Sequence, residues 1–139
     1  MAADPVILRK SQIIEQCLRR IHEEFGSSAS IVQLSQAAQD SVLLNLERAY
    51  QASIDMAMRL TRIHNLGIPL DARDSFELLF KQKILSEDQF KAMSSMVGFR
   101  NTAVHDYQGL NLKIVDVVVK TKLDDFRTFV GIAIKSSQN

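Results

Sequence analysis

The sequence has 139 residues, of which 46% are hydrophobic and 24% are charged, and its formal net charge is +1. This balance is typical of a soluble globular protein and excludes an intrinsically disordered chain. It also excludes a polycation that binds nucleic acid over its whole surface. Any binding of RNA or DNA must therefore depend on a local arrangement of side chains.

Cysteine content and apolar runs limit the class of protein further. Cys17 is the only cysteine, which excludes an internal disulfide framework and a cysteine-based zinc site. No apolar run approaches the roughly 20 residues that cross a bilayer. The first residues, MAADPVILRKSQ, lack the basic start of a signal peptide. We therefore expect one cytoplasmic domain over residues 1–139, without membrane contact.

The first half of the chain has the apolar spacing of two long helices. In residues 5–25 apolar side chains recur every three or four positions, and Gly26 is a suitable C-cap. Residues 27–36 form a polar connection. A longer helix is expected over residues 37–66, and the sequence GIP ends it.

A short helix and the start of another long one follow. Residues 71–83 are expected to form a loop with a short helix, capped by Asp74 or Ser75. Ser86 and Gln89 fit a capping box, in which each side chain bonds the backbone of the other residue. This box opens a fourth helix that continues past residue 100.

The last helix is predicted from one continuous apolar pattern, with Asn111 as its N-cap. IVDVVVK is strand-like in composition, but the helical spacing outweighs it. The apolar residues at this spacing are Leu112, Val115, Val119, Leu123, Phe126, Val130 and Ala133. The chain is therefore expected to be all-α, an antiparallel bundle of four long helices plus a short one.

The fourth helix ends in RNTAVHDY, residues 100–107, after an uncharged stretch over residues 92–99. One apolar stripe consists of Phe90, Met93, Val97 and Val104, and a second, on another face, of Met96, Phe99 and Ala103. A helix that is apolar on two faces needs two partners. A second copy of the chain is the simplest second partner, so we expect a homodimer. The alternative is that both stripes pack inside one chain.

An arginine five residues before a histidine is weak evidence by itself. Five helical residues place Arg100 and His105 about 140° apart around the axis, so the two need not touch in a regular helix. A second such pair, Arg59 and His64, is interpreted as ordinary surface at a helix end. Residues 100–107 differ from this pair because an uncharged stretch precedes them and because they lie just before the last helix.

At these residues the sequence resembles a known family. RNTAVHDY is similar to the R-x4-H-x-Y signature of the HepT toxins, a branch of the HEPN domains, and the resemblance extends over LNLERAYQASIDMA, GIP, DSFELL and LNLKIVDVV. It implies a helical bundle that dimerises and acts as a metal-independent endoribonuclease. It further implies a partner nucleotidyltransferase antitoxin of the MntA type, which uses ATP to adenylylate Tyr107 and so inactivates the toxin.

The chemistry of RNA cleavage fits the motif residues. RNA carries its own nucleophile, the ribose 2′-hydroxyl beside each phosphodiester. Histidine as a residue type titrates near neutral pH, so His105 is the candidate general base or acid. Arg100 offers a planar, permanently charged fork that matches phosphate oxygens. This reaction needs no metal or other cofactor, and it leaves a 2′,3′-cyclic phosphate and a 5′-hydroxyl.

Two further motif residues have alternative roles. Asn101 would orient Arg100 or the phosphate, or it is an ordinary polar helix residue. On the sequence alone, Tyr107 would most simply cover the helix end with its ring. The resemblance makes Tyr107 the acceptor of AMP, whose phosphate would then block the substrate site and pair with Arg100.

A function from another class competes with the ribonuclease toxin. A non-catalytic HEPN protein would serve as a binding or scaffold partner of a nucleotidyltransferase. Such a scaffold does not need Arg100, His105 and Tyr107 together, and all three are present. A purely structural bundle would leave the placement of Arg100 unexplained. The toxin is therefore the preferred interpretation.

Overall fold

A computed structural model describes residues 2–105 and 112–138, and the side chains of these residues except 100–105. The described parts form helices and no strands. The elements are α1 (Pro5–Phe25), the 3-10 helix η1 (Ile31–Gln33), α2 (Gln36–Ile63), α3 (Ala72–Lys81), α4 (Glu87–His105), α5 (Leu112–Thr121) and α6 (Leu123–Ser137). The all-α class is therefore confirmed. None of these described helices is long and apolar enough to cross a membrane.

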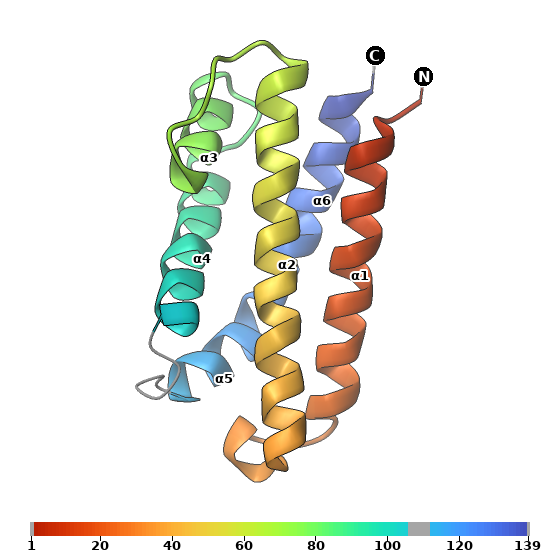
Figure 1. The fold of residues 1–139 in the computed structure, drawn as a ribbon, viewed down its shortest axis with the longest axis vertical. Coiled ribbons are helices and arrows are strands. Elements are labelled where there is room, and N and C mark those ends of the chain that lie inside the picture. Colours follow the sequence, from red (N-terminus) through yellow and green to blue (C-terminus); the bar gives the residue numbers. More distant parts are fainter. Residues whose placement is uncertain (1, 106–111, 139) are drawn as a thin grey trace.

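The long helix α2 is the centre of the bundle. It contacts α1, α3, α4 and α6, and Figure 1 shows α1 on one side of it and α3 with α4 on the other. Its buried apolar residues are Val42, Leu46, Ala49, Tyr50, Ala52, Ile54, Met56, Ala57 and Leu60. The burial of so many side chains from one helix is the main apolar contribution to the stability of the bundle. Tyr50 lies on this stripe and is 2% exposed.

The apolar spacing of residues 5–25 is confirmed in α1. Ile7, Ile14, Leu18 and Ile21 are fully buried, and the helix ends at Gly26, whose φ is 54°. Cys17 lies on the same inner face, and burial raises the pKa of its thiol above the ordinary value. It is therefore a small core residue rather than a reactive nucleophile.

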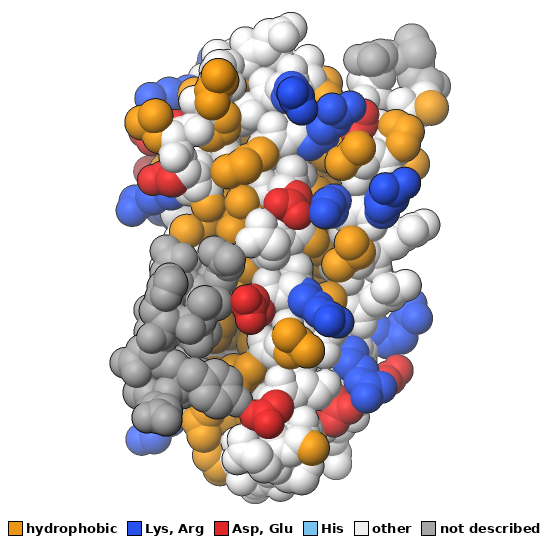
Figure 2. All heavy atoms as spheres, viewed as in Figure 1, with side chains coloured by type: hydrophobic (Ala, Val, Ile, Leu, Met, Phe, Trp, Pro, Cys, Tyr) orange, Lys and Arg blue, Asp and Glu red, His pale blue; other side chains and the backbone are white. Residues whose placement is uncertain are grey.

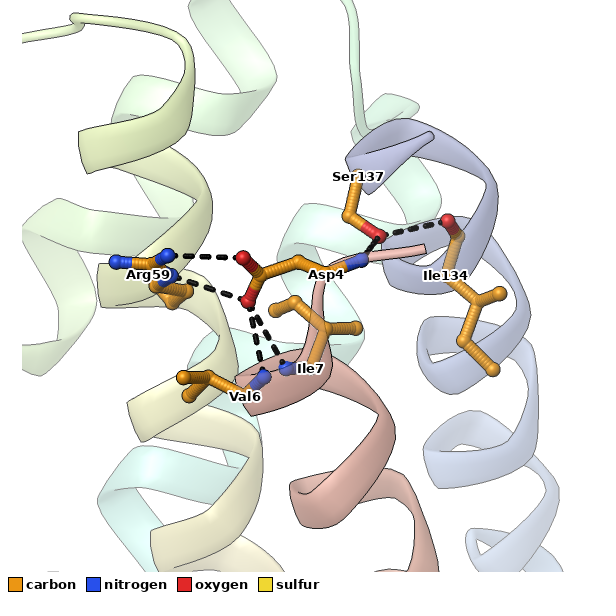
Figure 3. Close-up of polar contacts among 6 residues, drawn as sticks. All are labelled: Asp4, Val6, Ile7, Arg59, Ile134 and Ser137. Atoms are coloured by element: carbon orange, nitrogen blue, oxygen red, sulfur yellow. Dashed lines mark hydrogen bonds and ion pairs between the residues drawn. The ribbon is translucent and has the colours of Figure 1, made fainter. Parts of the chain in front are cut away.

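Polar contacts join the start of α1 to α2 and to the end of α6 (Figure 3). The carboxylate of Asp4 caps α1 by accepting from the backbone N–H groups of Val6 and Ile7, at 3.1 and 3.2 Å. The same carboxylate accepts from Nε and Nη2 of Arg59, at 3.1 and 2.8 Å. The backbone N–H of Asp4 donates to Oγ of Ser137 at 3.1 Å. One residue thus fixes three helix ends relative to one another.

The structure contradicts the predicted N-cap of α3 and confirms the predicted capping box of α4. Asp71, not Asp74 or Ser75, is the N-cap of α3, because its Oδ1 accepts from the backbone N–H of Asp74 at 2.8 Å. Asp74 instead bonds back toward the loop, where its Oδ2 accepts from the N–H of Leu70. The capping box at α4 is confirmed. The Ser86 N–H donates to Oε1 of Gln89 at 2.8 Å, and the Gln89 N–H donates to Oγ of Ser86 at 3.2 Å.

The prediction of one continuous last helix is wrong. The chain breaks at Lys122, whose φ and ψ are −117° and −1°, so that α5 and α6 are separate helices. The break is hidden in the sequence because Val115, Val119, Leu123 and Phe126 are all buried at the expected spacing. The structure thus has two helices, α5 and α6, where the sequence predicted one. The expected cap, Asn111, lies outside the described residues.

The break has a physical cause in the packing of α5. Asp116 of α5 accepts hydrogen bonds from the Ser30 hydroxyl at 2.6 Å and from the Ile31 N–H at 2.7 Å. These contacts hold α5 against η1, whereas α6 packs along α1, α2 and α4. A single straight helix cannot meet both sets of partners. Figure 1 shows α5 lying across the end of the bundle, at an angle to α6.

We predict that Asp4 stabilises the fold in a pH-dependent way. Its hydrogen bonds from Arg59 lower the pKa of the carboxyl below the ordinary value. A lowered folded-state pKa adds stability above the unfolded pKa, near 3.9, and this stability is lost as the pH falls through the folded pKa. Asp4→Asn, which keeps a cap acceptor but removes the charge, should therefore be less stable than wild type at pH 7 and equally stable in strong acid.

Urea unfolding at both pH values measures this difference. Asp4→Ala is the comparison variant, because it also removes the cap acceptor and should lose about 1–2 kcal/mol at pH 7. A deficit of Asp4→Asn that is the same at both pH values would contradict a contribution from the charge.

Candidate active site at the end of α4

The backbone of α4 is helical through His105, so the predicted catalytic residues lie on one regular helix. Arg100 and His105 are separated by about 140° around the axis and by roughly 7.5 Å along it. Asn101, the residue after Arg100, is about 100° from it around the helix axis. The two positions therefore lie on different faces of a regular helix.

Both apolar stripes of α4 pack inside the chain as far as their side chains are described. Met93 and Met96, one from each stripe, are each 2% exposed. Phe99 contacts the Tyr50 ring with 5.5 Å between ring centroids, and Phe90 stacks on Phe80 at 5.1 Å. The argument that the second stripe needs another chain is therefore wrong for Met96 and Phe99. The alternative, packing within one chain, holds for these residues.

The aromatic contacts fix α4 immediately before the motif. Tyr50 contacts Phe99 on one side, and its ring also contacts Phe126 of α6, with 5.0 Å between centroids. Phe99 directly precedes Arg100. The end of α4 is thus placed relative to α2 and α6 by rigid rings, which have few rotamers to lose.

The phenol of Tyr50 does not contribute acid–base chemistry. Burial raises its pKa well above the ordinary value, and the negative charge of Asp125 adds to the effect. Its hydroxyl is buried and has no hydrogen-bond partner within the described part of the chain. It stays protonated at neutral pH and is a core residue.

The helix that follows the motif is also held in place. Asp116 bonds α5 to η1, and Nζ of Lys120 donates to the carbonyl of Ala29 in the same connection. The segment between α4 and α5, residues 106–111, therefore joins two helices that are each fixed to the bundle. Tyr107, the predicted modification site, belongs to this segment and lies outside the described residues. The same is true of the side chains of Arg100, Asn101 and His105.

The second arginine–histidine pair lies at a helix end, as predicted for His64, but it is not ordinary surface. Both Nε and Nη2 of Arg59 are bonded to the carboxylate of Asp4. His64 is the C-cap residue of α2, and its Nε2 lies 3.0 Å from the carbonyl oxygen of Ser136 and 2.9 Å from the Ser136 hydroxyl. This pair is therefore occupied with contacts inside the bundle.

The face of the molecule that Figure 2 shows is mixed in charge. On the face formed by α1 and α2, lysine and arginine side chains are interspersed with acidic and apolar ones (Figure 2). His22 is exposed and lies 3.4 Å from Nη2 of Arg127. Among the described residues, no group of three or more His, Cys, Asp and Glu side chains is arranged to hold a metal ion.

Arg100 and His105 lie on the last turns of α4 in a helical bundle, which is the arrangement expected of the HEPN class of proteins. Comparisons with known proteins agree. The family model described as "Ribonuclease HepT-like" matches residues 7–132. The chain belongs to this family of ribonucleases, as the motif predicted. It is 42% identical over 127 residues to the mRNA nuclease HepT of Shewanella oneidensis, covering 91% of this chain and 95% of that protein.

Solved structures give the same relationship. A toxin–antitoxin crystal structure with AMP-PNP contains a chain that is 40% identical, with a TM-score of 0.88 and coverage of 94% of this chain and 98% of that one. The tri-AMPylated S. oneidensis HEPN toxin, solved in complex with an MNT antitoxin, is 41% identical, with a TM-score of 0.86 and coverage of 93% and 96%. The six-helix arrangement described above is thus that of a HEPN toxin.

Proposed function

We propose that this chain is the toxin of a toxin–antitoxin pair and cleaves mRNA without a metal, using Arg100 and His105. The observation that carries the proposal is the motif on the last turns of α4, within a chain that belongs to the HepT-like ribonucleases over residues 7–132. Its S. oneidensis relative is an mRNA nuclease that aligns with nearly the whole chain. The expected place of action is the cytoplasm, where mRNA is found.

The reaction needs one proton taken, one proton given and one cation. In the proposed mechanism, a histidine takes the proton of the ribose 2′-hydroxyl, and the oxygen attacks the adjacent phosphorus. The bond from phosphorus to the 5′-oxygen breaks, and that oxygen receives a proton. Arg100 stabilises the charge on the non-bridging oxygens with its planar fork. Asn101 orients Arg100 or the phosphate. The products are a 2′,3′-cyclic phosphate and a 5′-hydroxyl.

The proposed enzyme is a homodimer. Arg100 and His105 leave a regular helix about 140° apart, so a cleft between two copies provides more than one combination of these residues around a phosphate. Two histidines could then divide the two proton transfers. The exposed small residues Ser95 and Gly98 support close approach of a second backbone to α4.

Regulation is proposed to act on Tyr107. The S. oneidensis HEPN toxin is AMPylated and bound to an MNT antitoxin, and a related toxin–antitoxin complex contains AMP-PNP. We infer that a nucleotidyltransferase antitoxin transfers AMP from ATP to the Tyr107 oxygen, with release of pyrophosphate. The added phosphate would bring negative charge to Tyr107, which is two positions after His105 in the chain. It would therefore exclude the substrate both by its size and by its charge.

The catalytic assignment is tested by Arg100→Ala and His105→Ala. Loss of a general acid or base lowers the rate by about 100-fold or more, so both variants should lose RNA cleavage and relieve growth arrest on expression. Matched controls are Arg62→Ala and His64→Ala, which remove the same residue types from the end of α2. Cleavage of labelled RNA and growth after induction are the measurements. Full cleavage by folded His105→Ala would contradict the mechanism.

The regulatory assignment is tested by Tyr107→Phe. This variant should cleave RNA like wild type but should neither gain AMP nor be silenced when the antitoxin and ATP are added, because the acceptor oxygen is gone. Intact mass spectrometry and RNA cleavage, each before and after incubation with the antitoxin, are the measurements. Tyr50→Phe is the matched control, since Tyr50 is the only other tyrosine and is buried. Complete silencing of Tyr107→Phe would show that AMP transfer to Tyr107 is not the switch.

The dimer is tested at a helical glycine. Beyond its own helix, a Cβ added at Gly98 or at Gly131 would meet no atom of the described residues within 4 Å, so neither position is crowded by this part of the chain. Gly98→Leu should fold but dissociate into monomers, whereas Gly131→Leu on α6 should keep the wild-type mass. Light scattering after size-exclusion chromatography measures both. A wild-type mass for Gly98→Leu would place the interface elsewhere, and a monomeric wild type would contradict the dimer.

A further inference from the structure

A cavity of about 780 Å³ lies between the turn joining α3 to α4 and the end of α6. It is at the end of the bundle where α6 finishes and α4 begins, so the full length of α4 separates it from His105 (Figure 1). From Gln89 at its rim to the motif residues is roughly 16–24 Å along the helix axis. It is therefore not part of the catalytic cleft proposed above.

The charged side chains that line this cavity are all positive. Two lysines from different elements line it, Lys83 from the α3–α4 turn and Lys135 from the last turn of α6. Neither lysine makes an ion pair within residues 2–105 and 112–138, and no described lining residue is acidic. By contrast, nearby Lys81 and Lys91 are paired with Glu77 and Glu87. Unpaired lysines that line the same cavity favour an anionic ligand.

The rest of the lining suits an organic ligand that carries such an anion. Phe80, Ile84, Leu85 and Ile132 provide apolar surface, and the Phe80 ring is held by its stack on Phe90. Ser86, Gln89 and Ser136 provide polar groups that are fixed by hydrogen bonds within the chain. Gln89 accepts through Oε1, which leaves its amide N–H groups as donors. An aromatic and apolar surface beside cations is the combination that binds nucleotides of single-stranded nucleic acid.

The backbone conformation of Lys83 is a second, independent observation. Lys83 has a φ of +61°, because it occupies the left-handed position of the turn that ends α3. There its N–H donates to the Phe80 carbonyl, and the Ile84 N–H donates to the Leu79 carbonyl, both at 2.9 Å. Glycine is the usual residue at this position, followed by asparagine. The equivalent position after α2 is Asn65, with a φ of 55°. A lysine here is strained, which suggests that its charge is needed.

We infer that this cavity binds a nucleotide of the RNA substrate, with the phosphate between Lys83 and Lys135 and the base against the apolar surface that includes Phe80. The inference rests on the proposed RNA cleavage and extends it. RNA long enough to reach from the motif to the cavity is held at both, whereas a short oligonucleotide at the motif gains nothing from the lysines. The site thus selects extended single-stranded RNA.

Binding is measured by fluorescence anisotropy of a labelled single-stranded RNA with 2′-O-methyl groups, which lacks the attacking hydroxyl. On a single strand each phosphate contact contributes a slope of about 0.7 in log affinity against log salt, or about fourfold in affinity near physiological salt. Lys83→Gln/Lys135→Gln should therefore weaken binding at least about tenfold and lower the slope by about 1.4. The matched control, Lys81→Gln/Lys91→Gln, loses the same charge outside the cavity and should change neither quantity by as much.

A second variant separates binding from folding. Lys83→Gly relieves the left-handed strain, so its melting temperature should be no lower than that of wild type. It should nevertheless weaken RNA binding by about fourfold. Unchanged RNA binding by both the folded Lys83→Gly protein and the double variant would overturn the inference.

Cleavage assays distinguish this inference from the proposed function. If wild type cleaves RNA, the double variant should have a higher KM for a long RNA and an unchanged kcat/KM for a short oligonucleotide. Equal KM values on long RNA would overturn the inference and leave the ribonuclease intact. If wild type cleaves no RNA, the proposed function fails, whereas the anisotropy result stands by itself. A titration with AMP alone completes the test. Loss of AMP binding without loss of RNA binding in the double variant would overturn the RNA assignment in favour of a free nucleotide.

Discussion

The contact of the Tyr50 ring with Phe99 and Phe126 is the interaction on which the rest of the arrangement depends. It joins α2 to α4 and α6 at the level where α4 approaches the motif. The burial of the ring leaves its hydroxyl without a partner in the described part of the chain, which is unfavourable by about 1–3 kcal/mol for a buried polar group. The apolar burial and ring contacts outweigh this penalty. Phe99, the residue before Arg100, is therefore held in place relative to α2 and α6.

The bundle has two ends with different chemistry. At one end, Asp4 joins α1, α2 and α6 through Arg59 and Ser137, and the cavity with Lys83 and Lys135 lies at this end too. The other end carries the motif, between α4 and an α5 that Asp116 holds against η1.

The charge of the chain fits local recognition of RNA. A net charge of +1 gives little long-range attraction to a polyanion. On α3 and α4, Lys81 and Lys91 are paired with acids one helical turn away. Under the proposed RNA binding, unpaired cations such as Lys83 and Lys135 decide where a phosphate backbone binds. In such a protein, affinity comes from a small number of contacts and is correspondingly sensitive to single substitutions.

The sequence by itself determined the helices and the chemistry of the motif, because both depend on residues close in the chain. The capping box of Ser86 and Gln89, the end of α1 at Gly26 and the buried stripe of α2 all follow from local spacing. Only the tertiary structure decided the break at Lys122, since the apolar pattern continues through it and the cause is a contact from Asp116 to η1. It likewise placed Met96 and Phe99 inside the chain, because the facing surface comes from α2. Lys83 and Lys135 line one cavity because the α3–α4 turn lies beside the end of α6, and no spacing along the chain encodes this.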